Sequence, residues 1–413
     1  MRKYLFMLCS GMLLFAAEVS ANEPGFPDET ALQETEETVE VAVLLPEAGP
    51  EASQPAPPAP DEEKKKQWYD MLKWYGDFRY RWETIDVEDK DPRHRNRIRA
   101  RFGIKTELLE SFMVNFRLAT GSDDPVSTNQ TLGEGYATKQ INLDLAYFDW
   151  HPGQARGIHM MAGKMLNPFY TPIRTELIWD SDLTPGGVAG KFDREISPGA
   201  ELFGAVSAYW VDERKNDPSA LMYGFQGGAK FEVPDSKVYF RAGVSFYYYT
   251  NLQGYPILFD PEDPFGNSVV LDEETGELLY AYDYHLFEIF GDVGFAISSV
   301  PIAFLFDYVQ NMAPGVEQDK GWLVGFAVGK TKKPGNVKFY YNYRDLEADA
   351  VFGLATDSDF TGSGTNAKGS ETGFGVQIAK YVTGALSYFN NRLRPDDENT
   401  KYHRFMADIQ VKF

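Results

Sequence analysis

The sequence predicts an all-β protein, a transmembrane antiparallel β-barrel of about 16 strands with short periplasmic turns and long extracellular loops. Three observations support this fold class. Apolar and polar residues alternate with a period of two along many segments of the chain, which is the pattern of strands with two different faces. Short and long connections alternate between these segments. An export signal precedes them all.

Composition supports the same fold class and excludes several functions. Aromatic residues make up 15% of the chain, yet the mean hydropathy is −0.38, so rings and polar groups are interleaved. This suits a wall with a polar lumen and an apolar outer face. The net charge of −21 argues against nucleic acid as a partner. The only cysteine, Cys9, lies in the export signal, which excludes disulfides and cysteine chemistry from the mature chain.

The N-terminal region divides into two segments before the barrel. Arg2 and Lys3 precede an apolar run, and Val19, Ser20 and Ala21 form a small-residue cleavage site, so residues 1–21 are predicted to be a signal peptide. Residues 22–66 contain eight prolines and twelve acids, which predicts a disordered acidic, Pro-rich periplasmic linker. Residues 67–413 are the predicted barrel. No run outside the signal approaches the length of a transmembrane helix.

The first strands carry an unusual number of cations on one face. Phe78, Tyr80 and Trp82 alternate with Arg79 and Arg81, and the next strand alternates apolar residues with a ladder of arginines. On a barrel the polar face lines the lumen. The predicted pore-lining residues are Arg79, Arg81, Arg95, Arg97, Arg99, Arg101, Lys105 and Arg117.

The later strands follow in the same way. Short turns are predicted near 110–111, 151–154, 197–199, 234–236, 298–301, 332–336 and 383–384, with long loops strictly in between. The sixth strand, near 188–196, fits least well, because it points Arg194 toward lipid if Lys191, Asp193 and Glu195 face inward. The last strand ends in Phe413, which resembles the insertion signal of outer-membrane barrels.

The third long connection, 166–187, is predicted to fold into the barrel as a constriction loop. Three prolines limit its freedom, and apolar residues such as Leu177, Ile178 and Trp179 would otherwise face water. It also carries the acids Glu176, Asp180 and Asp182, which we expect to face the arginines across the lumen. A second acidic region, 251–283, holds eight acids and no Lys or Arg, and we place it at the extracellular mouth. Together these charges predict weak selectivity that leans toward anions.

No catalytic, cofactor or metal site is predicted. The five histidines lie far apart in sequence with no carboxylate at ligand spacing. Asp357 to Gly362 begins like a calcium loop, but the twelfth position is Lys368 where a bidentate Glu belongs. The glycine-rich stretch 361–369 lacks the spacing of a phosphate loop and is interpreted as a flexible loop.

Several motifs resemble the putative porin family of Gram-negative bacteria over about 74–413. They are Gly76 to Arg81, the arginine ladder with Gly103, Ala119 to Gly121, Leu143 to Trp150, Gly163 to Phe169 and Trp179 to Gly187. The resemblance implies a non-enzymatic channel in the outer membrane, surrounded by lipid and lipopolysaccharide, inserted by the barrel-assembly machinery and assembled as a homotrimer. Our interpretation is a porin for passive diffusion of small hydrophilic solutes and ions.

Three alternatives remain open at this point. The barrel could be a substrate-specific channel for an oligosaccharide or organic anion, which saturable solute block would reveal. It could be a barrel enzyme, although no Ser and His pair stands out. It could also be a non-conducting structural barrel or adhesin. An active transporter is disfavoured, because residues 22–66 are too few and too rich in proline to build a plug domain.

Overall fold

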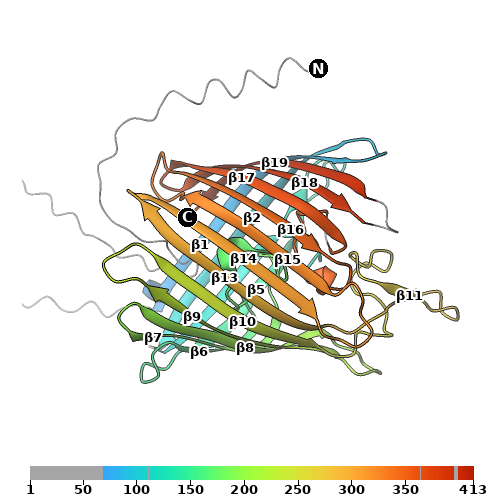
Figure 1. Cartoon of the computed structure of the whole chain (residues 1–413), viewed down its shortest axis with the longest axis horizontal. Helices are drawn as coiled ribbons and strands as arrows, with labels where there is room; N and C mark the ends of the chain where they lie inside the picture. Colours follow the sequence, from blue (N-terminus) through green and yellow to red (C-terminus); the bar gives the residue numbers. More distant parts are fainter. Residues whose placement is uncertain (1–67, 110, 363, 395–398) are drawn as a thin grey trace, which may run out of the picture.

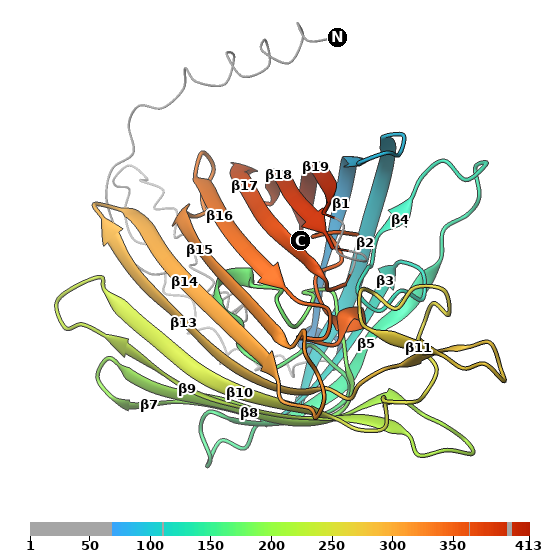
Figure 2. The same ribbon diagram turned by 45° about the vertical axis from the view of Figure 1, so that its right-hand side comes forward.

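The computed structural model describes residues 68–109, 111–362, 364–394 and 399–413. The predicted signal peptide and linker lie outside these residues. Seventeen of the strands described form one sheet, and 16 of them are long enough to build the wall of a closed barrel, because β4 (Gln130–Thr131) is a two-residue strand within a loop. Figures 1 and 2 show the tilted strands wrapping around a central space. The predicted all-β barrel of 16 strands is thereby confirmed.

The wall strands are long and tilted, as a membrane barrel requires. They are β1 (Leu72–Val87), β2 (Arg93–Leu109), β3 (Phe112–Thr120), β5 (Ile141–Trp150), β6 (Ile158–Lys164), β7 (Gly186–Ser197), β8 (Ala200–Asp212), β9 (Ala220–Glu232), β10 (Tyr239–Tyr249), β13 (His285–Ile297), β14 (Val300–Asn311), β15 (Lys320–Gly329), β16 (Val337–Leu346), β17 (Ala367–Ala379), β18 (Val382–Leu393) and β19 (Thr400–Lys412).

The barrel closes between its first and last strands. β1 pairs antiparallel with β2 on one side and with β19 on the other, in a register that places Asp77 opposite Lys412 and Val87 opposite Tyr402. The backbones of Gly76 and Phe413 exchange two hydrogen bonds at the end of this seam, at 2.9 and 3.0 Å. Because β19 has a partner on each side, neither edge of the sheet is left open.

The period of two in the sequence sorts side chains to the two faces of the wall. In β1, Arg81 and Glu83 are buried inside the barrel, whereas Tyr80 and Trp82 are each 41% exposed on its outside. The sixth wall strand, β7, keeps the predicted register. Arg194 pairs across the sheet with Leu202, and both side chains are exposed on the outer face. Arg194 lies near the end of β7, where an arginine can reach the polar interface.

Connections of different length gather at the two rims. One rim, the turn rim, has the short connections, such as 110–111 and 198–199, and the other, the loop rim, has the long ones, such as 121–140, 165–185, 250–284 and 347–366. The hairpin of β11 (Val269–Leu271) and β12 (Leu278–Tyr280) projects from the loop rim (Figure 1). The expected strict alternation is wrong for the first hairpin, 88–92, whose tight reversal uses Asp89 at a φ of 63°.

Helical structure is limited to three short 3-10 turns, η1 (Trp68–Met71), η2 (Pro172–Arg174) and η3 (Gly353–Ala355), in the described residues. None of the helices in this part of the chain is long and apolar enough to cross a membrane. The main buried apolar cluster joins residues of the loops 165–185 and 347–366 to inward-facing wall residues such as Tyr209 and Tyr247. The loops that pack there bring the groups of the candidate site together.

Candidate functional site in the barrel interior

Seven arginines line one side of the barrel interior, which we call the arginine wall. They lie on the inward faces of three adjacent strands, β1, β2 and β19, because alternate residues of a strand share a face. The three strands contribute Arg79, Arg81, Arg95, Arg97, Arg99, Arg101 and Arg404. Neighbouring strands are only about 5 Å apart, so this many cations require compensating charge close by.

Acids on the same strands supply part of that charge. Asp77 accepts hydrogen bonds from Arg99 at 3.1 Å and from Arg101 at 2.6 Å. Glu83, which is fully buried, binds Arg404 at 2.6 Å and also contacts Arg95. These contacts, all between residues of the wall strands, hold several arginine side chains in place without any contribution from a loop.

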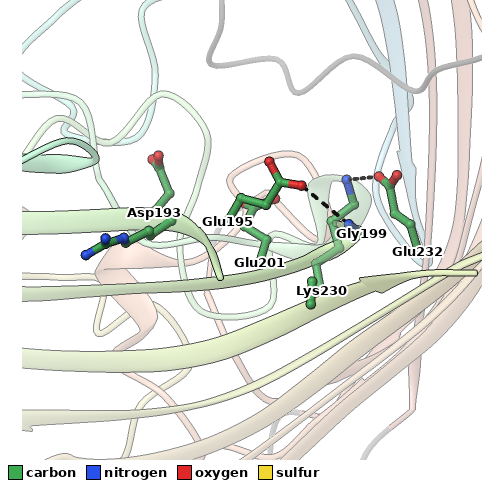
Figure 3. A pocket seen from close by; sticks show the side chains of 8 residues that line it. Asp193, Glu195, Gly199, Glu201, Lys230 and Glu232 are labelled. Atoms are coloured by element: carbon green, nitrogen blue, oxygen red, sulfur yellow. Dashed lines mark hydrogen bonds and ion pairs between the residues drawn. The ribbon is translucent and has the colours of Figure 1, made fainter. Parts of the chain in front are cut away.

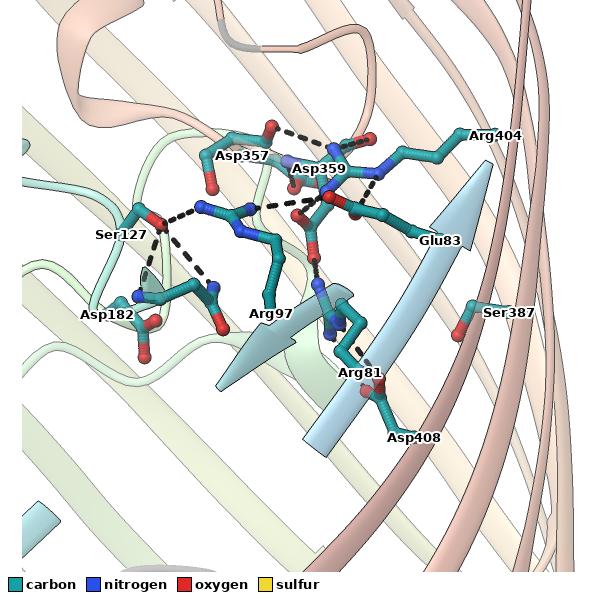
Figure 4. Close-up of polar contacts among 12 residues, drawn as sticks. Arg81, Glu83, Arg97, Ser127, Asp182, Asp357, Asp359, Ser387, Arg404 and Asp408 are labelled. Carbon is teal, nitrogen blue, oxygen red and sulfur yellow. Dashed lines mark hydrogen bonds and ion pairs between the residues drawn. The ribbon is translucent and has the colours of Figure 1, made fainter. Parts of the chain in front are cut away.

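Asp408 on β19 completes the set of wall acids. It binds Arg81 through two hydrogen bonds, at 2.8 and 2.9 Å, which is the bidentate geometry of a strong guanidinium pair. Its carboxylate also lies 4.0 Å from Arg79. Figure 4 shows Arg81 between Asp408 on one side and Asp359 on the other.

The connection 165–185, called the inner loop below, brings a further acid to the arginine wall. Asp182 lies 3.4 Å from Arg99 and 3.5 Å from Arg101, and it accepts a hydrogen bond from the Thr128 hydroxyl at 3.0 Å. Burial by itself would raise the pKa of Asp182. The positive charges of Arg99, Arg101 and Arg79 outweigh burial and hold that pKa well below its usual range. Asp182 is therefore ionised and in direct contact with the arginines.

The other two acids of the inner loop lie elsewhere, contrary to our expectation that all three would face the arginines. Asp180 accepts a hydrogen bond from the Ser358 backbone at 2.9 Å, and its own backbone N–H donates to the Ala355 carbonyl. Glu176, Asp180 and Asp357 come together within 4.8 Å of one another. Burial, and then the charges of Glu176, Asp182 and Asp357, raise the pKa of Asp180 well above its usual value. Contacts with the loop 347–366 therefore hold Glu176 and Asp180 away from the arginine wall.

The loop 347–366 also contributes an acid to the arginine wall. Asp359 lies 2.9 Å from Arg81 and 2.8 Å from Arg404 (Figure 4). Asp357 binds Arg344 of β16 at 2.8 Å. The calcium-like stretch considered in the sequence is thus engaged with arginines. Thr365 is buried and hydrogen-bonded to the Ala348 carbonyl at 2.6 Å, so this part of the predicted flexible loop is held in place.

On the opposite side of the interior, the inner loop is held mainly by aromatic packing. The rings of Phe169 and Trp179 meet Tyr247 of β10 edge to face, with centroids 5.0 and 5.1 Å apart. Two hydrogen bonds tie the loop to wall acids, from the Tyr170 hydroxyl to Asp292 at 2.7 Å and from Thr175 to Asp307 at 2.9 Å. The inner loop therefore spans the interior between this aromatic side and the arginine wall.

Two arginines of the wall are less fully compensated than the rest. Arg97 is 3.7 Å from Glu83 and donates to the Ser127 hydroxyl at 3.3 Å, and Arg79 donates to the Asn129 side chain at 2.6 Å. Their Nε atoms are buried without a hydrogen-bond partner within the described part of the chain. Arg79 and Arg97 thus carry most of the excess positive charge on this wall.

The remaining predicted residues lie farther from the arginine wall. Arg117 pairs with Asp144 of the neighbouring strand β5 at 2.5 Å. Lys105 lies over the Tyr75 ring at 4.9 Å, nearer the turn rim. Phe413 is 61% exposed at the seam between β1 and β19.

Sequence reasoning missed Arg404, Asp359 and Tyr247. Arg404 lies on the polar face of the last strand, but nothing in the sequence groups it with the other arginines, because only barrel closure makes β19 a neighbour of β1. Asp359 could have been suspected from the imbalance between the arginines and the acids on their own strands. The aromatic partner Tyr247 lies within a run of three tyrosines and carries no separate signal.

Comparisons with known proteins agree with this architecture. The family model described as putative porin matches residues 85–259 and 288–413. No curated protein sequence matches the chain. OprB of Pseudomonas putida is similar in structure, with a TM-score of 0.54, 12% identity, and 83% of this chain and 94% of that chain covered.

Two further solved structures share the fold at a TM-score of 0.50. Salmonella typhi OmpF, solved with daunomycin, has 13% identity over 83% of this chain and 97% of that chain. A loop-deletion mutant of OmpT from Vibrio cholerae has 12% identity over 83% of this chain and 99% of that chain. At such low identity these structures support the barrel fold, while the family match covers most of the chain. The chain therefore belongs to the putative porin family and is an outer-membrane porin.

Proposed function

We propose that this porin passes small polar solutes and ions passively through a water-filled route that the inner loop narrows. The observation that carries the proposal is that the inner loop bridges the interior, with Trp179 against Tyr247 on one side and Asp182 against Arg99 on the other. Solutes that cross the barrel then pass beside this loop and the arginine wall. The route needs no reaction, and we assign no enzymatic activity.

A weak preference for anions follows from the charges beside this route. Asp77, Glu83, Asp182, Asp359 and Asp408 neutralise most of the arginine wall, and Arg79 and Arg97 leave a modest positive excess. The acids of 251–283 lie toward the loop rim, and several of them are exposed. At physiological salt the Debye length is about 8 Å, so their field is largely screened before it reaches the interior.

A substrate-specific channel is the second candidate, and one observation favours it. Three loops, 121–140, 165–185 and 347–366, meet over the arginine wall and present hydroxyl and amide groups, including Ser127, Thr128 and Asn129, beside the cations. Such a mixed polar and cationic lining suits an organic anion or an oligosaccharide with several hydrogen-bonding groups.

Recordings of purified protein in planar bilayers, combined with liposome swelling, test the proposal. General diffusion predicts open channels and swelling rates that fall smoothly with solute size. Saturable block by one organic anion or oligosaccharide would favour the second candidate. Intact barrels that yield neither conductance nor swelling would overturn both and would favour a structural barrel.

Export and assembly are part of the same proposal. We assign residues 1–21 to a signal peptide, 22–66 to a periplasmic linker and 67–413 to the barrel in a Gram-negative outer membrane. Phe413 follows the alternating strand β19, and we propose that it is the signal read by the barrel-assembly machinery. Deleting Phe413, or Phe413→Asp, should strand protein in the periplasm. Undiminished heat-modifiable barrel in outer membranes would contradict this role.

We further propose a homotrimer surrounded by lipid and lipopolysaccharide. The outer face carries exposed apolar side chains on many strands, including Val206, Phe240, Phe304 and Ile409, so part of it can pack on neighbouring subunits and the rest on lipid. Light scattering of detergent-extracted protein should give three barrels per particle. A particle with one barrel would refute the trimer.

A further inference from the structure

A cluster of metal-binding side chains lies at the turn rim, away from the arginine wall. Asp149 is on the inward face near the end of β5, His151 begins the turn, and His159 is on the facing strand β6. Donor atoms of the three side chains all lie within 4.8 Å of one another. The expectation of no metal site took the five histidines as far apart, but His151 and His159 are only eight positions apart, Asp149 is two positions before His151, and the hairpin brings the three together.

The geometry of the cluster is set by the hairpin. The His159 Nδ1 atom lies 2.9 and 3.1 Å from the two carboxylate oxygens of Asp149. The His151 Nδ1 atom lies 3.8 Å from the same carboxylate, and the two imidazole rings are 5.5 Å apart between centroids. The His151 backbone N–H donates to the Ser111 carbonyl at 2.9 Å, which fixes the start of the turn.

An orphaned atom distinguishes this cluster from a satisfied His–Asp pair. The His151 Nδ1 atom is buried and has no hydrogen-bond partner among the residues described. Its 3.8 Å separation from Asp149 is too long for a hydrogen bond. Buried polar atoms normally have a hydrogen-bond partner or a bound ion. The His151 Nδ1 atom has no such hydrogen-bond partner within the described residues, although it faces a carboxylate and a second imidazole. A cation between the three groups would satisfy it.

The surroundings of the cluster suit a transition metal. Across the sheet, Asp149 pairs with Met113 on one side and Met161 on the other, so its neighbours in register are apolar. The His151 and His159 side chains are 29% and 34% exposed, so an ion can reach them from water at the rim. One cation opposes binding, since Lys191 pairs with His159 across the sheet.

Acids next to the cluster offset that cation. Asp193 lies 3.6 Å from the Lys191 ammonium group, and its backbone N–H donates to the Gly157 carbonyl of the same turn. Asp193 also borders a cavity of about 260 Å³, where the acids Asp193, Glu195, Glu201 and Glu232 outnumber the cations Arg194 and Lys230 (Figure 3). This acidic stretch of the rim favours the approach of cations.

We propose that Asp149, His151 and His159 bind a divalent transition metal of the zinc class. Two imidazoles and one carboxylate are donors that such ions prefer, whereas calcium and magnesium prefer sets made only of oxygen. Three protein ligands leave a further position for water. The bound ion joins the end of β5 and the turn to the start of β6, so it stabilises this hairpin.

Zinc titration of the purified, detergent-folded full chain without a histidine tag tests the proposal. Calorimetry should give one Zn²⁺ per chain, and Co²⁺ should give the absorption of a site with nitrogen and oxygen ligands. His151→Ala and His159→Ala should each weaken Zn²⁺ binding by roughly tenfold or more. His403→Ala is the matched control, because His403 stacks on Tyr388 outside the cluster. It should bind as the wild type does.

A second readout separates loss of the ligand from loss of the fold. At one Zn²⁺ concentration well above the wild-type Kd, the unfolding temperature should rise equally for the wild type and His403→Ala, and clearly less for His151→Ala. Heat-modifiable migration without metal shows that each variant is folded. Absence of stoichiometric binding to the wild type would overturn the proposal. So would equal affinity in a folded double variant, His151→Ala with His159→Ala.

Discussion

The two sides of the barrel interior hold the same loop by different physical interactions. On the aromatic side, Phe169 and Trp179 pack against Tyr247, and the contact is apolar and buried. On the arginine wall, Asp182 meets Arg99 and Arg101 at 3.4 and 3.5 Å in a network of buried ions. The strength of apolar packing depends little on salt or pH, whereas the strength of contacts between charged groups depends on both.

This difference suggests separate roles for the two contacts. Burial of large aromatic side chains supplies most of the free energy that keeps a loop docked, because each ring removes a large apolar area from water. A buried ion pair adds little net stability after desolvation, but leaving either charge buried and unpaired is costly. The pair therefore favours the one position of the loop in which both charges are paired. We infer that the aromatic side keeps the inner loop inside the barrel and that Asp182 places it against the arginines.

The largest effect is expected where an acid serves several arginines. Glu83→Ala should lower the free energy of unfolding by about 3 to 5 kcal/mol, because it leaves the buried Arg404 without its closest wall acid and removes a partner of Arg95. Urea unfolding of the folded barrel measures the change. Glu88→Ala removes an exposed pair with Lys401 and should change stability little. Equal losses in the two variants would contradict this explanation.

A somewhat smaller effect should follow from removing the aromatic contact. Trp179→Ala should weaken docking of the inner loop by about 3 kcal/mol through lost packing against Phe169 and Tyr247. Limited proteolysis should then cut within 165–185 while the barrel stays resistant. As a control, Trp210→Ala truncates a ring that is 58% exposed on the outer face and should not expose the inner loop.

The ionic contact should contribute less to docking and more to charge preference. Asp182→Asn should weaken docking by about 1 to 3 kcal/mol, and the positive excess of the arginine wall should increase. The zero-current potential across a salt gradient should then move toward anions. Gln substitutions at both Arg79 and Arg97 should move it toward cations, and Arg93→Gln, at an exposed position near the loop rim, should not. A potential that all these variants leave unchanged would mean that the arginine wall does not influence permeation.

The smallest effects concern pH, and the two acids should act with opposite sign. The lowered pKa of Asp182 means that its contribution is present above the ordinary carboxyl value of about 3.9 and is lost only as the pH falls further. The raised pKa of Asp180 means that its ionised form weakens docking to 347–366, so mild acidification should strengthen that contact. Single-channel conductance of the wild type and Asp180→Asn between pH 4 and 7 tests this. A pH dependence that persists unchanged in Asp180→Asn would exclude Asp180 as its source.

The strands were predictable from sequence because their signal is local. Alternation over about ten residues places Phe78 and Arg79 on opposite faces. It also puts Arg194 on the outer face, where the structure has it, although that position had counted against the register of its strand. Because each turn or loop joins two consecutive wall strands, strands that follow one another in the sequence become neighbours in the antiparallel barrel.

The contacts inside the barrel were not predictable in the same way. Arg81 and Asp359 are separated by 278 positions, and their contact needs both barrel closure and an inward fold of 347–366. The inward position of 165–185 was indicated by its apolar residues, but nothing local showed that Asp180 and Asp182 would have different partners. The cluster of Asp149 with His151 and His159 is local in the sequence, but it depends on how one turn orients two rings, and alternation says nothing about the inside of a turn.

The conductance of a variant without the central part of the inner loop tests the central claim most directly. Residues 171–182 are replaced by a short Gly-Ser linker, which removes Trp179 and Asp182 and thus both contacts. The control is an excision of 272–277, the tip between β11 and β12 that projects from the loop rim. We predict a clearly larger single-channel conductance for the first variant and an unchanged one for the second. An unchanged conductance in a correctly folded first variant would contradict the claim that the inner loop narrows the route.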